Sequence, residues 1–302
     1  MSKHAYLLVA NSNFKVLEIC LKMIDDERND IYMLFDAKSK ISNEKLEGLK
    51  QSVVKSQLFI LPSIVINWAG YSQIQAVLNL IKMANSRGEE YSYLHFFQGS
   101  DLPIKSQDQI HSYFEQNNGY EFVMIDTPNK KMAQNKAWYR HYFCHNRYFR
   151  KNKFIKVLNF GLVYLQKIFR IRKNKDIELY QGSALFSITG NCAKFVEEEI
   201  PQIRKRFKHS LAADEVFLQT ILMASEYGLK IKNVDQSVSC NARMIDRTRP
   251  DGKNSPHVWR REEVDYLLSL PDGFCFARKF DEKIDFDTAR LLFQSICKKE
   301  TL

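Results

Sequence analysis

Short apolar runs alternate with amphipathic segments through the first 125 residues. The runs have the length of buried parallel strands and occupy residues 5–10, 31–35, 58–61, 64–66, 93–97 and 121–125. Apolar residues recur at helical spacing over 16–24 and 74–83. This series predicts an α/β fold with a mostly parallel central sheet and helices on both faces. Ligands of such sheets bind beyond the carboxyl ends of the strands, where we expect Asp36 and the turn 98–101.

The pattern changes in the second half of the chain. Residues 130–174 are aromatic, basic and poor in turn residues, and a helix is predicted over 154–171, with its apolar residues flanked by cations. Globular patterning then returns. It predicts strands at 184–188 and 230–234, a helix that begins with Asp214-Glu215, and a loop over 243–257.

Positive charge is concentrated in one segment. The net charge is +10, and residues 147–175 contain ten Lys or Arg and no Asp or Glu. A local basic patch is therefore expected rather than a surface that binds nucleic acid, for which no recognition motif is present. Two interpretations of helix 154–171 stay open. It could lie on an anionic membrane with its apolar face inserted, or it could be a core helix with solvated lysines.

Cysteine usage and the N-terminus bear on the cell compartment. The six cysteines are scattered and show no metal-ligand spacing. The N-terminus lacks a signal-peptide pattern, and no apolar stretch reaches the roughly 20 residues that span a bilayer. We therefore expect a cytoplasmic protein with reduced thiols, either soluble or peripheral on the inner face of the membrane.

Several enzyme classes are disfavoured by missing motifs. The chain has no phosphate-binding Gly-x-x-x-x-Gly-Lys, no dinucleotide-binding Gly-x-Gly-x-x-Gly and no Gly-x-Ser-x-Gly nucleophile turn. The segment Asp285-Phe286-Asp287 is more typical of a solvated turn than of a metal site, because a hard cation needs several converging oxygens. No resident metal is expected.

The adjacent acids Asp214 and Glu215 begin an apolar run and are the main catalytic candidates. Acids at this position often only stabilise the helix dipole. Two other segments favour a catalytic role for these acids: Gly182-Ser183 lies upstream in the sequence, and the basic segment 277–281 lies downstream. A carboxylate base and a cation at a phosphate are the parts that a metal-free sugar transfer needs.

Six motifs occur in an order that matches a known family. They are Asp36-Ala37-Lys38-Ser39, Asn67-Trp68-Ala69-Gly70-Tyr71-Ser72, Gln98-Gly99-Ser100-Asp101-Leu102-Pro103-Ile104-Lys105-Ser106, Gly182-Ser183-Ala184-Leu185-Phe186, Asp214-Glu215-Val216-Phe217-Leu218-Gln219-Thr220 and Phe276-Ala277-Arg278-Lys279-Phe280-Asp281. In these segments the chain resembles the core-2/I-branching β-1,6-N-acetylglucosaminyltransferase family, which also contains the peptide O-xylosyltransferases. Missing features of the animal members favour a bacterial-type member.

The resemblance implies one glycosyltransferase domain over residues 1–302 with a GT-A-like fold. It would divide into a nucleotide-binding half (1–128), a basic aromatic insertion (129–178) and an acceptor and catalytic half (179–302). The implied reaction is an inverting, metal-independent transfer of a sugar, N-acetylglucosamine first of all, from a UDP-sugar to a glycan hydroxyl in surface polysaccharide synthesis. The acceptor could be lipid-linked. The alternatives are xylosyl transfer from UDP-xylose and a non-catalytic membrane- or glycan-binding module.

The resemblance also assigns roles to residues. Glu215 would be the general base, and Lys279 would bind the donor diphosphate, assisted by Arg260 or Arg261. Asp36 would lie at the uracil end of the donor. Substrate contacts would come from Asp101, Trp68, Gly182, Ser183 and Asp214. Plainer roles stay open for three of them: Lys279 could pair with Asp281 at the surface, Asp101 could stabilise a turn, and Trp68 could pack in the core.

Overall fold

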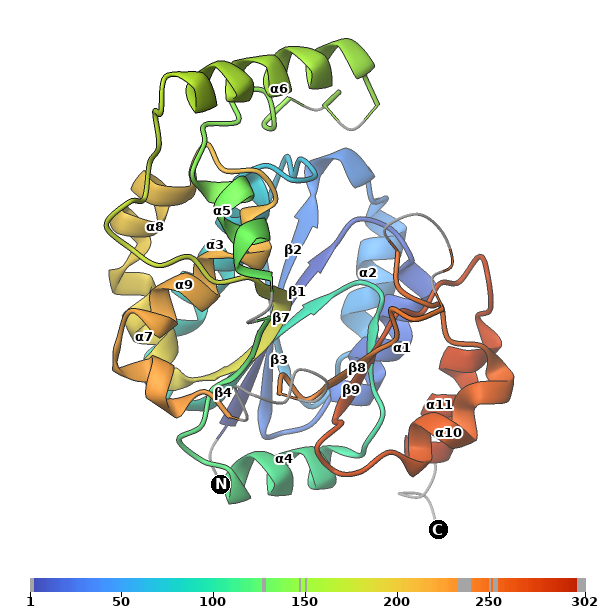
Figure 1. The fold of residues 1–302 in the computed structure, drawn as a ribbon. Coiled ribbons are helices and arrows are strands. Elements are labelled where there is room, and N and C mark those ends of the chain that lie inside the picture. The colour runs from blue at the N-terminus through green and yellow to red at the C-terminus, as the bar shows by residue number, and fades with distance from the viewer. Residues whose placement is uncertain are drawn as a thin grey trace.

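The computed structural model describes residues 3–126, 129–146, 148–149, 151–232, 240–249, 251 and 255–297. A six-stranded sheet forms its centre (Figure 1). The strands lie in the order β3 (Gln57–Ile64), β2 (Asn29–Asp36), β1 (Lys3–Ala10), β4 (Tyr91–Gln98), β7 (Gly182–Thr189) and β6 (Phe122–Ile125). β1 is parallel to β2 and β4, and β2 to β3, whereas β7 is antiparallel to β4 and β6. The predicted mostly parallel sheet is confirmed.

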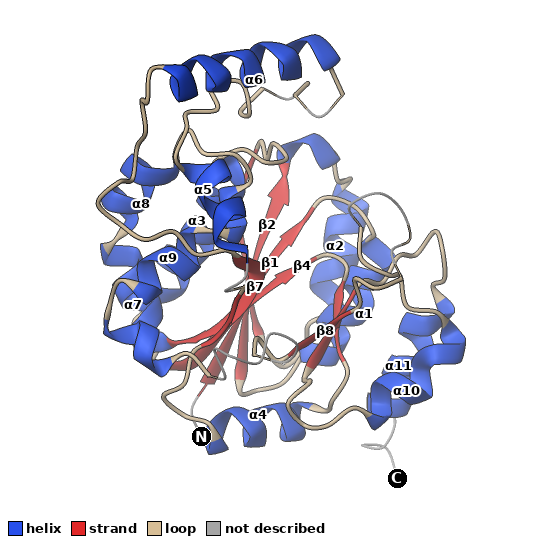
Figure 2. Ribbon diagram, in the orientation of Figure 1, coloured by secondary structure: helices blue, strands red, loops and turns tan. Residues whose placement is uncertain are grey.

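Helices cover both faces of this sheet, as the sequence predicts (Figure 2). Side chains alternate along β1, so Leu7 and Leu8 belong to the cores on opposite faces. The first core includes residues of α3 (Ser72–Asn85), α7 (Gly190–Glu198), α8 (Ile200–Phe207) and α9 (Phe217–Met223). The second includes residues of α1 (Phe14–Ile24), α2 (Asn43–Gln51), α4 (Gln107–Gln116), α10 (Val264–Ser269) and α11 (Asp287–Cys297).

A second sheet of three short strands was not expected from the sequence. Its strands are β5 (Asp101–Pro103), β9 (Phe276–Arg278) and β8 (Arg243–Ile245), with β9 in the middle. β9 is antiparallel to β5 and parallel to β8. The predicted loop over 243–257 is therefore wrong for its first three residues. Strands of three residues are too short to show a period in the sequence.

The strand predicted at 230–234 is also wrong where it can be examined. Lys230 ends a short 3-10 helix, η4 (Glu226–Lys230), and Ile231 forms an isolated parallel bridge with Glu121. Residues 233 and 234 lie outside the described residues. The alternating pattern of this segment reflects the burial of Ile231 beside β6 rather than a full strand.

Arg243 joins the two sheets. Its buried guanidinium donates to the carbonyls of Phe96 in β4 and Phe186 in β7, and to Asn241 O and Ser187 Oγ, over 2.6–3.1 Å. Burial lowers its pKa to about 10, because a charge is poorly solvated there. The four acceptors offset much of that loss of hydration.

Residues 129–178 contain α5 (Lys130–Ala137) and α6 (Lys153–Ile168). α5 packs against a one-turn 3-10 helix, η3 (Ala213–Glu215). α6 lies at the top of Figure 1, apart from the central sheet. None of the helices in the described ranges is long and apolar enough to cross a membrane.

We expect Arg243→Lys to lower the free energy of unfolding by about 3 kcal/mol, because a lysine cannot donate to all four acceptors and leaves buried carbonyls without partners. Urea unfolding measures the change. The matched control is Arg290→Lys on α11, where the side chain is mostly exposed and the change should stay within about 0.5 kcal/mol. Equal losses in the two variants would contradict the anchoring role of Arg243.

Candidate active site

A cavity of about 840 Å³ lies at the carboxyl edge of the central sheet. Its size is in the range usual for small-molecule sites. Residues that line it come from the segments 9–13, 36–38, 98–100, 214–217 and 278–283, together with Trp68 and residues near 148. The position agrees with the edge at which the strand pattern places a ligand.

Asn13 connects three segments at the cavity. Its Nδ2 donates to the carbonyls of Gly99 and Phe280, both at 2.9 Å, and its Oδ1 accepts from the backbone N–H of Glu282 at 2.7 Å. Asn13 has φ 63°, a left-handed conformation that asparagine tolerates well. Its side chain makes no capping hydrogen bond to α1. The Asn13 side chain therefore joins the segments that carry Gly99, Phe280 and Glu282 at the cavity wall.

Several cations line the cavity: Lys38, Lys151, Arg278, Lys279 and Lys283. Arg278 donates to Asp101 Oδ1 at 2.5 Å and to Gln98 Oε1 at 2.7 Å, which fixes its guanidinium. Lys279 Nζ lies 3.8 Å from Asp281 Oδ2, at the outer limit of an ion pair. Lys279 thus reaches the cavity wall while it is only loosely paired. The second cation beside it is Arg278, which the motif comparison did not single out.

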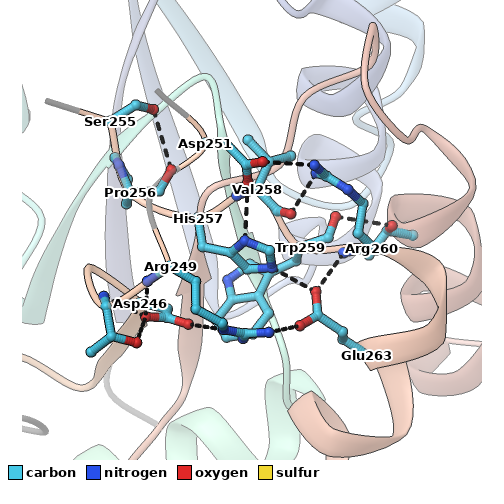
Figure 3. Close-up of polar contacts among 12 residues, drawn as sticks. Asp246, Arg249, Asp251, Ser255, Pro256, His257, Val258, Trp259, Arg260 and Glu263 are labelled. Carbon is cyan, nitrogen blue, oxygen red and sulfur yellow. Dashed lines mark hydrogen bonds and ion pairs between the residues drawn. The ribbon is translucent and has the colours of Figure 1, made fainter. Parts of the chain in front are cut away.

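The structure does not bring Arg260 or Arg261 to the cavity. Figure 3 shows Arg260 directed at Asp251, to which its Nη2 donates at 2.8 Å, while its Nη1 donates to Val258 O. Arg261 is exposed at the start of η5 (Arg261–Glu263).

Arg260 belongs to a polar network around His257, whose ring nitrogens contact Asp251 and Glu263 at 3.0 and 2.8 Å (Figure 3). Arg249 completes this network through Asp246 and Glu263. The network shapes the loop after β8. Contacts with Asp251 and Val258 thus hold Arg260 away from the cavity, and its position in the sequence does not reveal them.

The expected donor contact Asp36 and the expected substrate contact Trp68 both line the cavity. Asp36, at the end of β2, accepts from the backbone N–H groups of Lys38 and Ile66 at 3.1 and 3.2 Å, so its carboxylate is buried but well satisfied. Trp68 is half exposed on the cavity wall. The alternative that Trp68 packs in the core is therefore wrong.

Asp101, Gly182 and Ser183 do not line the cavity. Asp101 is buried and carries the pair with Arg278, so the structure favours its structural interpretation. A Cβ at Gly182 would lie 1.8 Å from Met124 O, which means that the glycine allows β7 to approach β6. Ser183 Oγ accepts from the N–H of Leu185. Ala184, the next residue, is the one that reaches the cavity.

The acids Asp214 and Glu215 lie in η3, one turn before α9. Both acids fall in the first turn of η3, and none falls in the first turn of α9, so the helix-dipole interpretation stays open for η3 alone. Asp214 lines the cavity and accepts from Gln73 Nε2 at 3.1 Å. Glu215 is not among the lining residues, although it follows Asp214 directly.

Glu215 is held by two donors that the motifs did not reveal. Lys136 Nζ, from α5, donates to Glu215 Oε2 at 2.5 Å, and Gln181 Nε2 donates to the same oxygen at 3.1 Å. A third of the Glu215 side chain is exposed. Lys136 lies 79 residues away in sequence, so no local pattern could have paired it with Glu215.

The pKa of Asp214 is raised to about 7, mainly by burial and then by the neighbouring charge of Glu215. Lys136 opposes this rise. The two adjacent acids thus differ, since Asp214 can hold a proton near neutral pH while Glu215 is paired with a lysine. Among the described residues, no group of three His, Cys, Asp or Glu side chains is placed to hold a metal ion.

The fold and the cavity are those of an α/β enzyme that binds its ligand at the carboxyl edge of the sheet. The model of the Core-2/I-Branching enzyme family matches residues 4–266. The chain therefore belongs to this family and is a glycosyltransferase, and the mixed α/β fold agrees with the GT-A-like class expected from the sequence.

Similar proteins include the β-1,3-galactosyl-O-glycosyl-glycoprotein β-1,6-N-acetylglucosaminyltransferase 4 of Danio rerio, which is 22% identical over 318 residues, covering 98% of this chain and 70% of that protein. A similar solved structure is the apo form of mouse xyloside xylosyltransferase 1, with a TM-score of 0.36, 7% identity and coverage of 92% of this chain and 97% of that chain. Another is core-mannan synthase A from Aspergillus fumigatus in an Mn/GDP form, with a TM-score of 0.34, 8% identity and coverage of 76% and 72%.

Asp214 gives a pH-dependent prediction. Because its pKa is about 7 when folded and about 4 when unfolded, the folded chain binds its proton more tightly and stability falls as pH rises between these values. The substitution Asp214→Asn removes this pH-dependent loss of stability, and the Asn side chain can still accept the hydrogen bond from Gln73. We therefore expect the melting temperature of the variant to rise relative to the parent protein between about pH 4 and about pH 7. Asp265→Asn, exposed on α10, should follow the parent at every pH. If the melting temperature of Asp214→Asn differed from that of the parent by the same amount at every pH, the link between the Asp214 proton and stability would be disproved.

Proposed function

We propose that this protein is an inverting, metal-independent transferase that moves N-acetylglucosamine from a UDP-sugar to a glycan hydroxyl. The observation that carries the proposal is that one cavity combines Asp214, next to Glu215, with the cations Arg278 and Lys279. The Danio rerio relative is named a β-1,6-N-acetylglucosaminyltransferase, which supports the choice of sugar.

Glu215 is the general base in this proposal. Lys136 and Gln181 both donate to Oε2, so they fix the carboxylate and leave Oε1 for the acceptor hydroxyl. As the hydroxyl proton moves to Oε1, the hydroxyl oxygen bonds to the anomeric carbon from the face away from the diphosphate. The bond between that carbon and the diphosphate breaks, and UDP leaves with the electron pair. Attack from the opposite face inverts the configuration.

Fixed cations balance the charge of the leaving UDP. Arg278 is held by Asp101 and Gln98, and both Arg278 and Lys279 line the cavity. Charged donors positioned before the reaction stabilise an oxyanion without reorganisation. Asp36 lies at the uracil end and Trp68 on the wall in this arrangement. Side chains thereby supply the charge that a divalent ion provides in other transferases.

We further propose a role in the synthesis of a surface polysaccharide. The support is the position of the cavity beside the basic, apolar surface of α6, since Tyr148 and Lys151 line the cavity and Lys153 begins α6. A glycan carried on a lipid could reach the cavity from that side. The alternative reaction, transfer of xylose from UDP-xylose, is tested in the assay described next, which compares several UDP-sugars as donors.

Glu215→Gln should lower turnover by about 10²–10⁴-fold, because the amide cannot take the hydroxyl proton. UDP release is measured over a panel that includes UDP-N-acetylglucosamine and UDP-xylose, with EDTA present. Glu262→Gln, exposed in η5, is the matched control and should keep the parent rate. Activity that EDTA abolishes would overturn the metal-independent mechanism, and full activity of Glu215→Gln would overturn the assignment of the base.

Lys279→Gln should weaken UDP binding by about 10–100-fold, because a charged hydrogen bond to the diphosphate is lost. Isothermal titration with UDP measures this. Arg261→Gln should bind UDP like the parent, since Arg261 is exposed and lies outside the cavity. If Arg261→Gln weakened UDP binding more than Lys279→Gln did, Arg261 would be the cation at the diphosphate and the assignment of Lys279 would be rejected.

A further inference from the structure

α6 exposes most of its large apolar side chains, while its inner side carries Asn159 and Gln166 together with the buried Val163. Phe154 and Val157 are 73% and 70% exposed, and Tyr164, Leu165, Ile168 and the adjoining Phe169 are exposed as well. In Figure 1 the helix lies as a separate rod above the rest of the fold. Monomeric proteins rarely leave so many large apolar side chains together in water, so such a face normally has a partner.

The inner side of α6 is held by polar contacts. Asn159 is fully buried, with Oδ1 accepting from the N–H of Phe143 and Nδ2 in contact with the His141 ring at 3.0 Å. Gln166 accepts from the N–H of Arg140 at 2.9 Å and donates to its carbonyl at 3.0 Å. These contacts fix which side of the helix faces outward. The interpretation of 154–171 as a core helix with solvated lysines is therefore wrong.

The charges around this face indicate what covers it. Lys153 and Lys167 are exposed on α6, Lys156 is partly exposed, and residues 147–175 contain no Asp or Glu. Two copies of the chain meeting face to face would bring these like charges together, which is unfavourable. An anionic bilayer attracts the cations and accepts the apolar side chains, and a 16-residue helix about 24 Å long can lie flat in its interface.

We infer that α6 binds an anionic membrane surface and thereby holds the cavity next to the bilayer. The connection is short, because Tyr148 and Lys151 line the cavity and Asn152 caps α6 by accepting from the N–H groups of Phe154 and Ile155. The inference that an acceptor glycan is presented on a lipid rests on the proposed function. Binding to the membrane itself does not.

The test is co-sedimentation of the purified protein with vesicles of phosphatidylglycerol and phosphatidylcholine or of phosphatidylcholine alone. We expect binding to the anionic vesicles at low salt, weaker binding at high salt and little binding to phosphatidylcholine. Val157→Ser with Ile168→Ser should weaken binding at least about tenfold by removing inserted apolar area. Lys153→Gln, Lys156→Gln and Lys167→Gln together should weaken it by a similar factor and remove most of the salt dependence.

Matched controls lie elsewhere on the surface. Leu229→Ser removes an exposed leucine in η4, and Lys22→Gln, Lys50→Gln and Lys55→Gln remove the same charge at or near α1 and α2. Both controls should bind vesicles like the parent protein. Absence of binding to anionic vesicles, or equal losses in controls and α6 variants, would overturn the inference. A dimer in sedimentation velocity that the Val157→Ser and Ile168→Ser substitutions dissociate would also overturn it, because a second copy would then cover the face.

A donor assay without vesicles separates this inference from the proposed function. UDP release into water or a soluble acceptor should be unchanged in the α6 variants, which differ from the parent only in vesicle binding. If UDP release is absent in the parent protein while vesicle binding holds, the proposed function fails and the membrane surface stands. If UDP release is normal but vesicles are not bound, the proposed function stands and the membrane inference is rejected.

Discussion

The pair between Asp101 and Arg278 is the constraint on which the cavity depends. Asp101 is buried at the start of β5, just after the turn that ends β4, and it accepts from Arg278 and from the N–H of Gln98. A buried carboxylate is tolerated only when it is well paired. β9 therefore has to lie beside β5, and this places Lys279, the next residue, at the cavity. Asn13 then fixes the residues that follow through their backbone groups.

The sequence predicted the central part of the fold because that information is local. All eight residues of β2 are buried, so a continuous apolar run marks the strand. Most residues of β1 and β4 are buried as well. Parallel strands joined by helices place their carboxyl ends on one edge of the sheet. Asp36 and the turn 98–101 could be assigned to this edge for the same reason. Their positions follow from strand order, which chain pattern and connection rules largely determine.

The missing parts of the site depend on contacts between distant segments. Lys136 reaches Glu215 across 79 residues, and Arg278 reaches Asp101 across 177. Neither pair has a spacing that a helix or hairpin would impose. Arg260, one of the two arginines proposed from sequence to assist Lys279, is held elsewhere by Asp251. Only the register of the second sheet shows which cation belongs to the cavity, and its three-residue strands leave no period to detect.

Residues 129–178 form one basic segment in the sequence, but in the structure their lysines occupy two different environments. Lys136, on α5, points inward and holds Glu215, whereas Lys153 and Lys167, on α6, remain outside beside an apolar surface. Arg140, three residues after the end of α5, is hydrogen-bonded to Gln166 of α6. This contact links α6 to the segment that follows the helix carrying Lys136, the residue that pairs with Glu215. The positive charge of residues 129–178 is therefore divided between a lysine that pairs with Glu215 and lysines that remain on the surface.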